Sequence, residues 1–465
     1  MPTKILSLLA ALSVVLIPSA VADNSAPVSS APAYELGSLR LGYTQPYSKL
    51  KGADKLNFRL GQAIFEKIWV SSPSSTTASD GLGPYFNARA CVHCHPRNGR
   101  AQAAWGDFGT PLAATFGTVF HLSEPSGQSH TQAHPVYGNQ LQSASVASLP
   151  IEAKATVQYT PRIVTLADQT QVELRVPSYT FSEFSQGAFN ADTRFSPRLA
   201  PAIYGLGVLS HISDDDIRSA EDPNDQNNDG ISGRINWVTD RHTGQPAIGR
   251  FGLKANHPSV AQQNAVALHN DIGLSNPMFT DAAGDCSPAQ PLCKDPRFSG
   301  ATAPHNLEVP HELTEVLDYY TLHLKAPLAR NKQSPAVEQG KKVFYDIGCQ
   351  QCHRSDYPSL NTLDPRRVGA TEPYTDLLLH DMGPALADQR KDHLATGQEW
   401  RTPALWGIGL TERVLGYQNY LHDGRARTLL EAVLWHGGEA SRHQQAVIEL
   451  TTEQRNALIS FLESL

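Results

Sequence analysis

What the sequence lacks narrows its function before any motif is considered. It has one long apolar run, at residues 5–17, which is too short to span a membrane, so no membrane span is expected in the mature protein. The formal net charge is −7 and no basic stripe is present, which argues against a nucleic-acid partner. Methionine is scarce: besides Met1 there are only Met278 and Met382, so few positions offer a thioether ligand.

The N-terminus has the features of a secretory signal peptide. Lys4 precedes the apolar run, and Ala20, Val21 and Ala22 form a small-x-small cleavage site. Removal of residues 1–22 would leave a mature chain of about 440 residues, enough for two or three domains. We expect the protein in a bacterial periplasm or a similar oxidising compartment.

The six cysteines fall into three pairs. Two pairs lie in CVHCH (91–95) and CQQCH (349–353), and the third, Cys286 and Cys293, lies in the proline-rich stretch CSPAQPLC. Exposed thiols do not persist in an oxidising compartment, so the third pair predicts a small disulfide-closed loop.

C-x-x-C-H is the attachment motif of c-type haem. Two thiols on one helical turn reach the two vinyl groups of the porphyrin, and the histidine that follows binds the iron. A Cys₄ zinc site would leave both histidines unexplained, and a thioredoxin-like pair would need a βαβ setting. The sequence therefore predicts two covalent haems with His95 and His353 as proximal ligands. The attaching cysteines would be Cys91, Cys94, Cys349 and Cys352.

Helical patterns frame both motifs. Apolar residues recur at helical intervals over 56–70 before the first motif and over 336–348 before the second. Segments 312–324 and 452–465 are predicted to be the closing helices, and 325–335 has the composition of a linker.

These patterns predict a mainly α protein with two cytochrome c-like haem domains in tandem. An N-terminal extension (23–55) would precede a first haem domain (56–330), and a second would span 331–465. The first domain would carry an insertion at about 100–250, which includes a β-hairpin over about 154–181.

The two halves contain matching segments in the same order. PAIYGLG (201–207) matches PALWGIG (403–409), and NAVALHNDIG (264–273) matches EAVLWHGGEA (431–440). The second match places His269 opposite His436. The ordered series favours a duplicated haem domain.

The sequence resembles the bacterial di-haem cytochrome c peroxidase superfamily, and most closely its branch of di-haem oxidoreductases, also called "thiol oxidoreductases". The thiol label has no support here, because four cysteines would hold haem and two would pair. The motifs that carry the resemblance are GLGPYFNARACVHCHPRNGR (81–100), DPNDQNNDGISGR (222–234), LLLHDMGPALAD (377–388), EWRTPALWGIG (399–409) and YLHDGRARTLLEAVLWHGGEA (420–440).

The resemblance implies that the C-terminal haem is six-coordinate and transfers electrons, with its distal ligand at His436. The alternatives are Met382 as the ligand, or His436 as a histidine that interacts with a helix C-terminus. The resemblance also implies that the N-terminal haem carries the chemistry with an open distal face. Gln263 matches the distal glutamine, and Asp271 is the nearest acid where a glutamate is usual. Leu253 replaces the tryptophan expected between the haems.

His269 admits three interpretations. It closes the first haem as an iron ligand, or it moves a proton across a bound O–O group, or it is an unrelated helix-surface histidine. Gln263, His269 and Asp271 are thus the candidate catalytic residues.

The stretch that begins at Asp225 has the first half of a calcium-binding EF-hand loop. Asp225, Asn227 and Asp229 would offer side-chain oxygens and Ile231 a carbonyl. Position twelve is Asn236 rather than glutamate, so the loop is either a calcium site of another kind or an Asx-rich turn.

Together these features predict a periplasmic, peroxidase-like di-haem oxidoreductase. A small cytochrome c or cupredoxin would deliver electrons to the C-terminal haem, and the N-terminal haem would reduce H₂O₂ or a related oxidant. One alternative is an electron-transfer protein with both haems six-coordinate. Another is an oxygen-activating enzyme that modifies a protein or polymer.

Overall fold

The computed structural model describes residues 42–103, 106–107, 117–125, 132–147, 149–295, 307–388 and 390–465. The predicted signal peptide and part of the N-terminal extension lie outside these ranges. Within them, no helix is long and apolar enough to cross a membrane.

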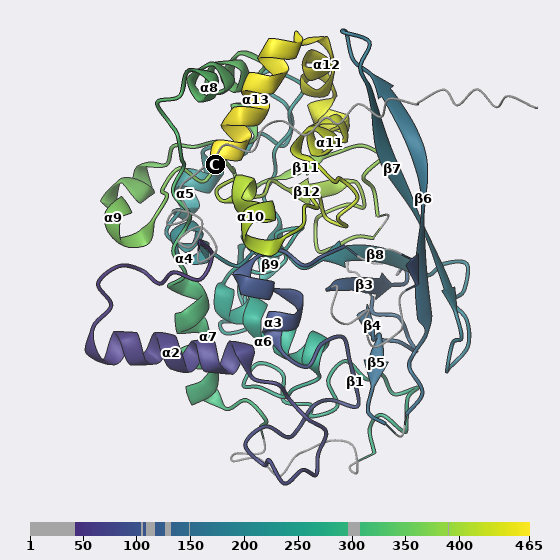
Figure 1. The fold of residues 1–465 in the computed structure, drawn as a ribbon. Coiled ribbons are helices and arrows are strands. Elements are labelled where there is room, and N and C mark those ends of the chain that lie inside the picture. The colour runs from purple at the N-terminus through teal and green to yellow at the C-terminus, as the bar shows by residue number, and fades with distance from the viewer. Residues whose placement is uncertain are drawn as a thin grey trace, which may run out of the picture.

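Helices occur throughout the described chain (Figure 1). The longer ones are α2 (Gly52–Glu66), α6 (Val260–Ile272), α7 (His311–Leu322), α8 (Pro335–Asp346), α12 (Ser441–Glu449) and α13 (Thr452–Ser464). The short α-helices are α3 (Cys91–Cys94), α4 (Leu206–Ser210), α5 (Asp214–Arg218), α9 (Pro365–Val368), α10 (Thr411–Leu415) and α11 (Leu429–Leu434). The 3₁₀ turns are η1 (Pro96–Asn98), η4 (Cys349–Gln351), η5 (Pro358–Thr362), η6 (Ile408–Leu410) and η7 (Gly438–Ala440).

Within the described ranges the strands form five small antiparallel sheets. The two-stranded sheets pair β1 (Tyr85–Phe86) with β5 (Ala144–Ser145), β9 (Trp237–Thr239) with β10 (Pro246–Ile248), and β11 (Leu379–Asp381) with β12 (Glu399–Arg401). One three-stranded sheet has the order β2 (Gly106–Asp107), β6 (Lys154–Thr165), β7 (Gln171–Ser182). The other has the order β4 (Gln140–Leu141), β3 (Thr118–Ser123), β8 (Arg194–Leu199).

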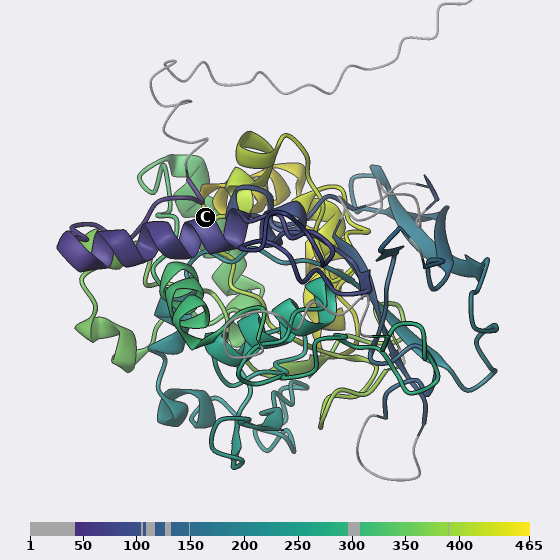
Figure 2. The ribbon, with the colours of Figure 1, turned by 90° about the horizontal axis from the view of Figure 1, so that it is seen from below.

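The prediction of a mainly α protein holds only in part. Helix accounts for 31% of the chain and strand for 19%, so the fold is mixed. Much of the strand content lies in the predicted insertion, where β-branched and aromatic residues favour extended structure. Figures 1 and 2 place α2 on one side of the molecule and the long strands β6 and β7 of this insertion on the opposite side.

Two pairs of helices cross with matching contacts. In α2, a Cβ added at Gly61 would lie 1.9 Å from the carbonyl oxygen of Val316 in α7. In α8, a Cβ added at Gly340 would lie 1.8 Å from the carbonyl oxygen of Ala457 in α13. Only glycine allows these backbones to approach so closely.

An aromatic residue stands four positions after each of these glycines. The ring of Phe65 lies 5.4 Å from Tyr320 and 6.2 Å from His95. The ring of Phe344 lies 5.2 Å from Phe461 and 6.4 Å from His353. The two helix crossings therefore stand in the same relation to the two C-x-x-C-H motifs.

The matching segments PAIYGLG and PALWGIG pack on each other. A Cβ at Gly205 would lie 2.7 Å from the Trp406 ring, and a Cβ at Gly407 would lie 2.8 Å from the Tyr204 hydroxyl. Both glycines have positive φ (76°), which other residues rarely adopt. The repeat found in the sequence thus forms a reciprocal contact between the two halves.

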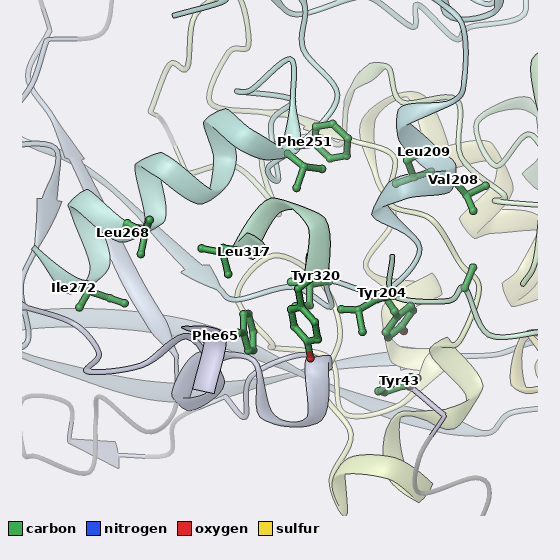
Figure 3. Packing of buried hydrophobic residues seen from close by; sticks show 14 of the residues in the cluster. Tyr43, Phe65, Tyr204, Val208, Leu209, Phe251, Leu268, Ile272, Leu317 and Tyr320 are labelled. Carbon is green, nitrogen blue, oxygen red and sulfur yellow. The ribbon is translucent and has the colours of Figure 1, made fainter. Parts of the chain in front are cut away.

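The apolar cores cross the predicted boundary near residue 330. The largest cluster, part of which Figure 3 shows, is built mainly from the N-terminal half but includes Trp406 and Leu410. The second cluster is built mainly from the C-terminal half but includes Leu166 and Leu174 of the hairpin.

The hairpin β6–β7 confirms the strands predicted over about 154–181, but it packs against the C-terminal half (Figure 1). At its turn, the Ala167 amide donates to the carbonyl of Ile448, and Arg455 donates to the Asp168 carboxylate at 2.7 Å. The insertion therefore fastens the two halves together.

The predicted disulfide is confirmed, because Cys286 and Cys293 are bonded to each other. The other four cysteines are unpaired, as their place in the two C-x-x-C-H motifs predicts.

Candidate haem sites

The first C-x-x-C-H motif places two thiols on one turn of helix and an imidazole directly after it. Cys91–Cys94 form α3, and His95 leaves the helix with φ −120° and ψ 62°. The Nδ1 atom of His95 lies 2.7 Å from the carbonyl oxygen of Pro201, so Nδ1 carries the proton and donates. The Nε2 lone pair is then available for an iron atom.

The second motif repeats this arrangement. Cys349 begins the 3₁₀ turn η4, and Nδ1 of His353 lies 2.8 Å from the carbonyl oxygen of Tyr374. Burial lowers the pKa of His95 and of His353 to about 4, so both imidazoles are neutral at physiological pH. Both sites fit a c-type haem.

The cysteine environments do not suit thiol chemistry. Burial raises the pKa of Cys91 and of Cys349 to about 12. A reactive thiol needs a depressed pKa, because the thiolate is the nucleophile. These cysteines match attachment points rather than redox thiols.

His436, the distal ligand predicted for the second haem, has one ring nitrogen in a backbone hydrogen bond and the other free. It follows the end of α11, and its Nδ1 donates to the carbonyl of Ala432 at 2.8 Å, which leaves Nε2 free. Burial lowers the pKa of His436, and its charge is among the influences that lower the pKa of His353. The two buried imidazoles therefore lie near each other. Met382, the alternative ligand, places its carbonyl oxygen against Gly437.

His269 does not stand where His436 stands. Ser259 caps α6 by accepting from the amide of Gln262, and Thr428 caps α11 in the same way through Glu431. His436 lies eight residues after its cap and His269 ten residues after its own. His269 lies inside α6, whereas His436 lies two residues beyond the last residue of α11, so the two histidines do not occupy equivalent positions.

Ala267 occupies the position eight residues after Ser259 and therefore matches His436. Alanine has no ligand atom. The ring of His269 instead stacks on Phe279 at 4.7 Å, and its nearby charges are Asp281 and Arg241. The count from the helix caps is thus offset by two residues from the alignment by sequence, which places His269 opposite His436.

The three predicted catalytic residues of α6 point in different directions. The Oε1 atom of Gln263 lies 3.4 Å from a Cβ built at Gly252. The Asp271 carboxylate accepts from Gln140 at 2.7 Å, and its charge influences both Cys91 and Cys94. Burial raises the pKa of Asp271 to about 6. Among the described residues, no hydrogen bond or ring contact joins Gln263, His269 and Asp271.

Leu253 lies where the two halves of the chain meet. The Arg401 amide donates to the carbonyl of Leu253 at 3.0 Å, and the Arg401 guanidinium donates to Gly252 at 2.9 Å. The position is at the interface, as the resemblance implies, but its side chain is aliphatic. Aromatic residues at this interface include Tyr204 and Trp406, which the sequence showed only as part of the repeat.

Sequence reasoning also missed a buried polar group beside the second motif. His380 contacts Asp376, Glu439 and the sulfur of Cys352. Burial opposes its charged form, but the Asp376 carboxylate holds the pKa of His380 well above its ordinary value. The i, i+4 spacing of Asp376 and His380 was visible in the sequence, whereas Glu439 is distant in it.

The calcium-type loop is folded as a series of Asx turns. Asp225 accepts from the amides of Asp229 and Gly230, and Asn227 accepts from Asp229. The loop docks on the second motif, because Gln351 donates to Asp229 at 3.1 Å. Ile231 donates its amide to Asp229, and its carbonyl is in no backbone hydrogen bond of the described residues.

The side chain of Asn236 does not face this loop. Its amide group donates to the carbonyls of Lys254 and Asp392, so the residue at position twelve of the loop sequence forms buried hydrogen bonds elsewhere. The EF-hand is incomplete, as predicted.

Comparison with known proteins places these sites in context. Residues 142–465 match the family described as "Di-haem oxidoreductase, putative peroxidase". A solved structure of Kuenenia stuttgartiensis hydrazine synthase aligns with 98% of this chain and 100% of its own, at 14% identity and a TM-score of 0.33. A likeness that weak carries no argument. No curated protein matches the chain.

Proposed function

The chain belongs to this di-haem oxidoreductase family, and from that membership we propose that it is a peroxidase-like enzyme with two covalent c-type haems. The observation that carries the proposal is the asymmetry at the sixth ligand position. We infer that His436 closes one haem and that Ala267, its counterpart by the count from the helix caps, leaves the other open. One closed and one open haem suit an enzyme rather than an electron carrier.

Two sets of residues would hold the haems. Cys91, Cys94 and His95 would bind haem 1, and the haem 2 set would be Cys349, Cys352, His353 and His436. We infer that each set belongs to a cytochrome c-like unit, within 56–330 and 331–465, closed by one of the two helix crossings. When bound, the haems would supply electron transfer and, at the open position, reduction of H₂O₂ or a related oxidant.

Asp271 is the residue best suited to handle protons near haem 1. Reduction of H₂O₂ to two waters consumes two electrons and two protons. A carboxyl group with a pKa of about 6 can hold and release a proton near neutral pH, and Asp271 lies beside Cys91 and Cys94. His269 suits this role less well, because its pKa is about 4 and its ring stacks on Phe279.

The electron route from haem 2 to haem 1 would pass through Tyr204 and Trp406. Leu253 and Phe251 offer no readily oxidised ring. The segment of Tyr204 supplies the carbonyl that binds His95, and the Leu405 amide beside Trp406 donates to Pro373, next to the carbonyl that binds His353. Each ring is thus tied through a few bonds to one proximal histidine.

The surroundings of Trp406 suit oxidation better than those of the other tryptophans. Among the tryptophans in the described part of the chain, only Trp406 has no cation over its ring. A nearby cation makes removal of an electron harder. The cations over the other rings are Lys67 (Trp69), Arg218 (Trp237), Lys254 and Arg198 (Trp400), and Arg162 and Arg425 (Trp435).

The cellular setting follows from the sequence. We propose export to the periplasm with loss of residues 1–22, and a small cytochrome c or cupredoxin as the electron donor. We also propose a calcium ion at Asp225, Asn227, Asp229 and Ile231, which would neutralise carboxylates close to Gln351 of the second motif.

Spin-state spectroscopy tests the proposed function. Electron paramagnetic resonance of the oxidised protein should show one high-spin and one low-spin haem, and cyanide should bind to one of them. The half-reduced protein should be reoxidised by H₂O₂. Two low-spin haems that neither bind cyanide nor react with peroxide would instead indicate an electron carrier. Product formation that requires O₂ but no peroxide would indicate the oxygen-activating alternative.

A further inference from the structure

A buried histidine lies between two carboxylates beside a haem-attaching cysteine. His380 is 3% exposed, its Nε2 lies 2.8 Å from Asp376 Oδ2, and its Nδ1 lies 2.8 Å from Glu439 Oε2. The same Nδ1 lies 3.8 Å from the sulfur of Cys352. In the haem-bearing protein that sulfur would be a thioether.

The hydrogen bonds fix the charge of His380. An ionised carboxylate only accepts, so each ring nitrogen must carry a proton and the ring is an imidazolium. The Asp376 carboxylate also accepts from the Leu378 amide at 3.0 Å. The cation and its two carboxylates together carry one negative charge.

Glu439 is held in place from the other side. It accepts from the amide and hydroxyl of Ser232 at 3.0 and 2.8 Å, and from the Asp381 amide at 3.1 Å. Ser232 belongs to the loop that contains the calcium-type sequence. A Cβ at the next residue, Gly233, would lie 2.9 Å from His380 Cε1, so the loop closes directly over the imidazolium. The group is therefore shielded from water.

We propose that His380, Asp376 and Glu439 form an electrostatic control element that sets the reduction potential of haem 2. Charges in a buried site are weakly screened, so each acts strongly on a nearby haem. A cation favours the reduced haem, which carries one more electron, and a carboxylate favours the oxidised haem. His380 is here a positioning residue, and the inference rests on the proposed attachment of haem 2 at Cys352.

Two substitutions of opposite sign test this element. His380→Gln removes the cation and should lower the midpoint potential of haem 2. Glu439→Gln removes an anion and should raise it. We expect each variant to change the equilibrium constant for reduction about tenfold, which is about 59 mV for one electron. The measurement is a potentiometric titration of the purified holoprotein, followed through the absorbance of haem 2, with haem content checked by mass spectrometry.

His443→Gln is the matched control. His443 lies near the same motif but bonds the amide oxygen of Gln351 and is only partly buried, so its loss should leave the potential of haem 2 nearly unchanged. Shifts of the same sign in His380→Gln and Glu439→Gln, or no shift in Glu439→Gln, would overturn the inference. Should His380→Gln fail to fold, Asp376→Asn replaces it and should raise the potential. A protein that carries no haem at Cys352 would refute the proposed function rather than this inference. The midpoint potential can be measured whether or not the protein has peroxidase activity.

Discussion

The rings of Tyr204 and Trp406 each cover the glycine that follows the other residue. Gly407 contacts Tyr204 and Gly205 contacts Trp406. Each half thus supplies one glycine and one aromatic ring to the same pair of contacts. This contact joins the two segments that hold the proximal histidines.

Trp406→Phe should slow electron transfer between the haems about tenfold, a change of about 1.4 kcal/mol in the barrier. Phenylalanine keeps most of the packing but is much harder to oxidise. The rate can be followed by absorbance after flash reduction of haem 2 with a photosensitiser, which needs no peroxide. Trp400→Phe is the matched control, because Trp400 has Lys254 over its ring. Trp406→Tyr restores an oxidisable ring and should recover most of the rate. The route would be ruled out if Trp406→Phe transferred electrons as fast as the unmodified protein, or if Trp406→Tyr were as slow as Trp406→Phe.

His436→Ala should convert haem 2 from low spin to high spin, because the free Nε2 of His436 is its proposed sixth ligand. Added imidazole should restore the low-spin spectrum. His269→Ala should leave the low-spin signal unchanged, since the ring of His269 stacks on Phe279. Loss of the low-spin signal in His269→Ala, with retention in His436→Ala, would reverse this assignment.

Glu152 should make stability fall as the pH rises. Burial raises its pKa from 4.5 to about 8, so the folded state prefers the protonated form. This stabilising preference is fully present below pH 4.5, the unfolded value, and is lost as the pH rises through 8. Denaturant unfolding of the holoprotein at pH 5 and pH 8 should therefore show a smaller pH-dependent loss for Glu152→Gln. A loss as large as in the unmodified protein would contradict the assignment.

Leu174→Ala should lower the free energy of unfolding by about 2–5 kcal/mol, because it leaves a cavity in a core built mainly by the C-terminal half. Ile163→Ala on the same hairpin is the control. Ile163 is 52% exposed, so its loss should cost about 0.5 kcal/mol or less. Urea unfolding followed by the absorbance of each haem would show which half responds. Similar losses of unfolding free energy in the two variants would argue that the hairpin does not hold the two halves together.

The local chemistry of this protein could be predicted from its sequence, whereas contacts between distant segments could not. The C-x-x-C-H motifs need only neighbouring residues, and α7 and α13 lie within two residues of the segments predicted at 312–324 and 452–465, because their amphipathic pattern is local. The partner of the β6–β7 hairpin depends on tertiary packing, which alternation of residues cannot reveal.

The repeat illustrates the same limit. His269 and His436 were aligned by similar neighbours, whereas the count from the caps Ser259 and Thr428 places Ala267 opposite His436. Each cap was present in the sequence, a serine or threonine three residues before a glutamine or glutamate. The group around His380 offered less warning, because its carboxylates come from positions 376 and 439.

The hairpin that leaves the first half and buries Leu166 and Leu174 in the second changes what a duplication means for this chain. Two copies joined by a linker can usually be cut apart into modules that fold alone. Here each copy lacks part of its own interior until the other has formed. We therefore expect the two halves to fold together. A fragment that ends near residue 330 would leave the apolar face of the β6–β7 hairpin exposed to water.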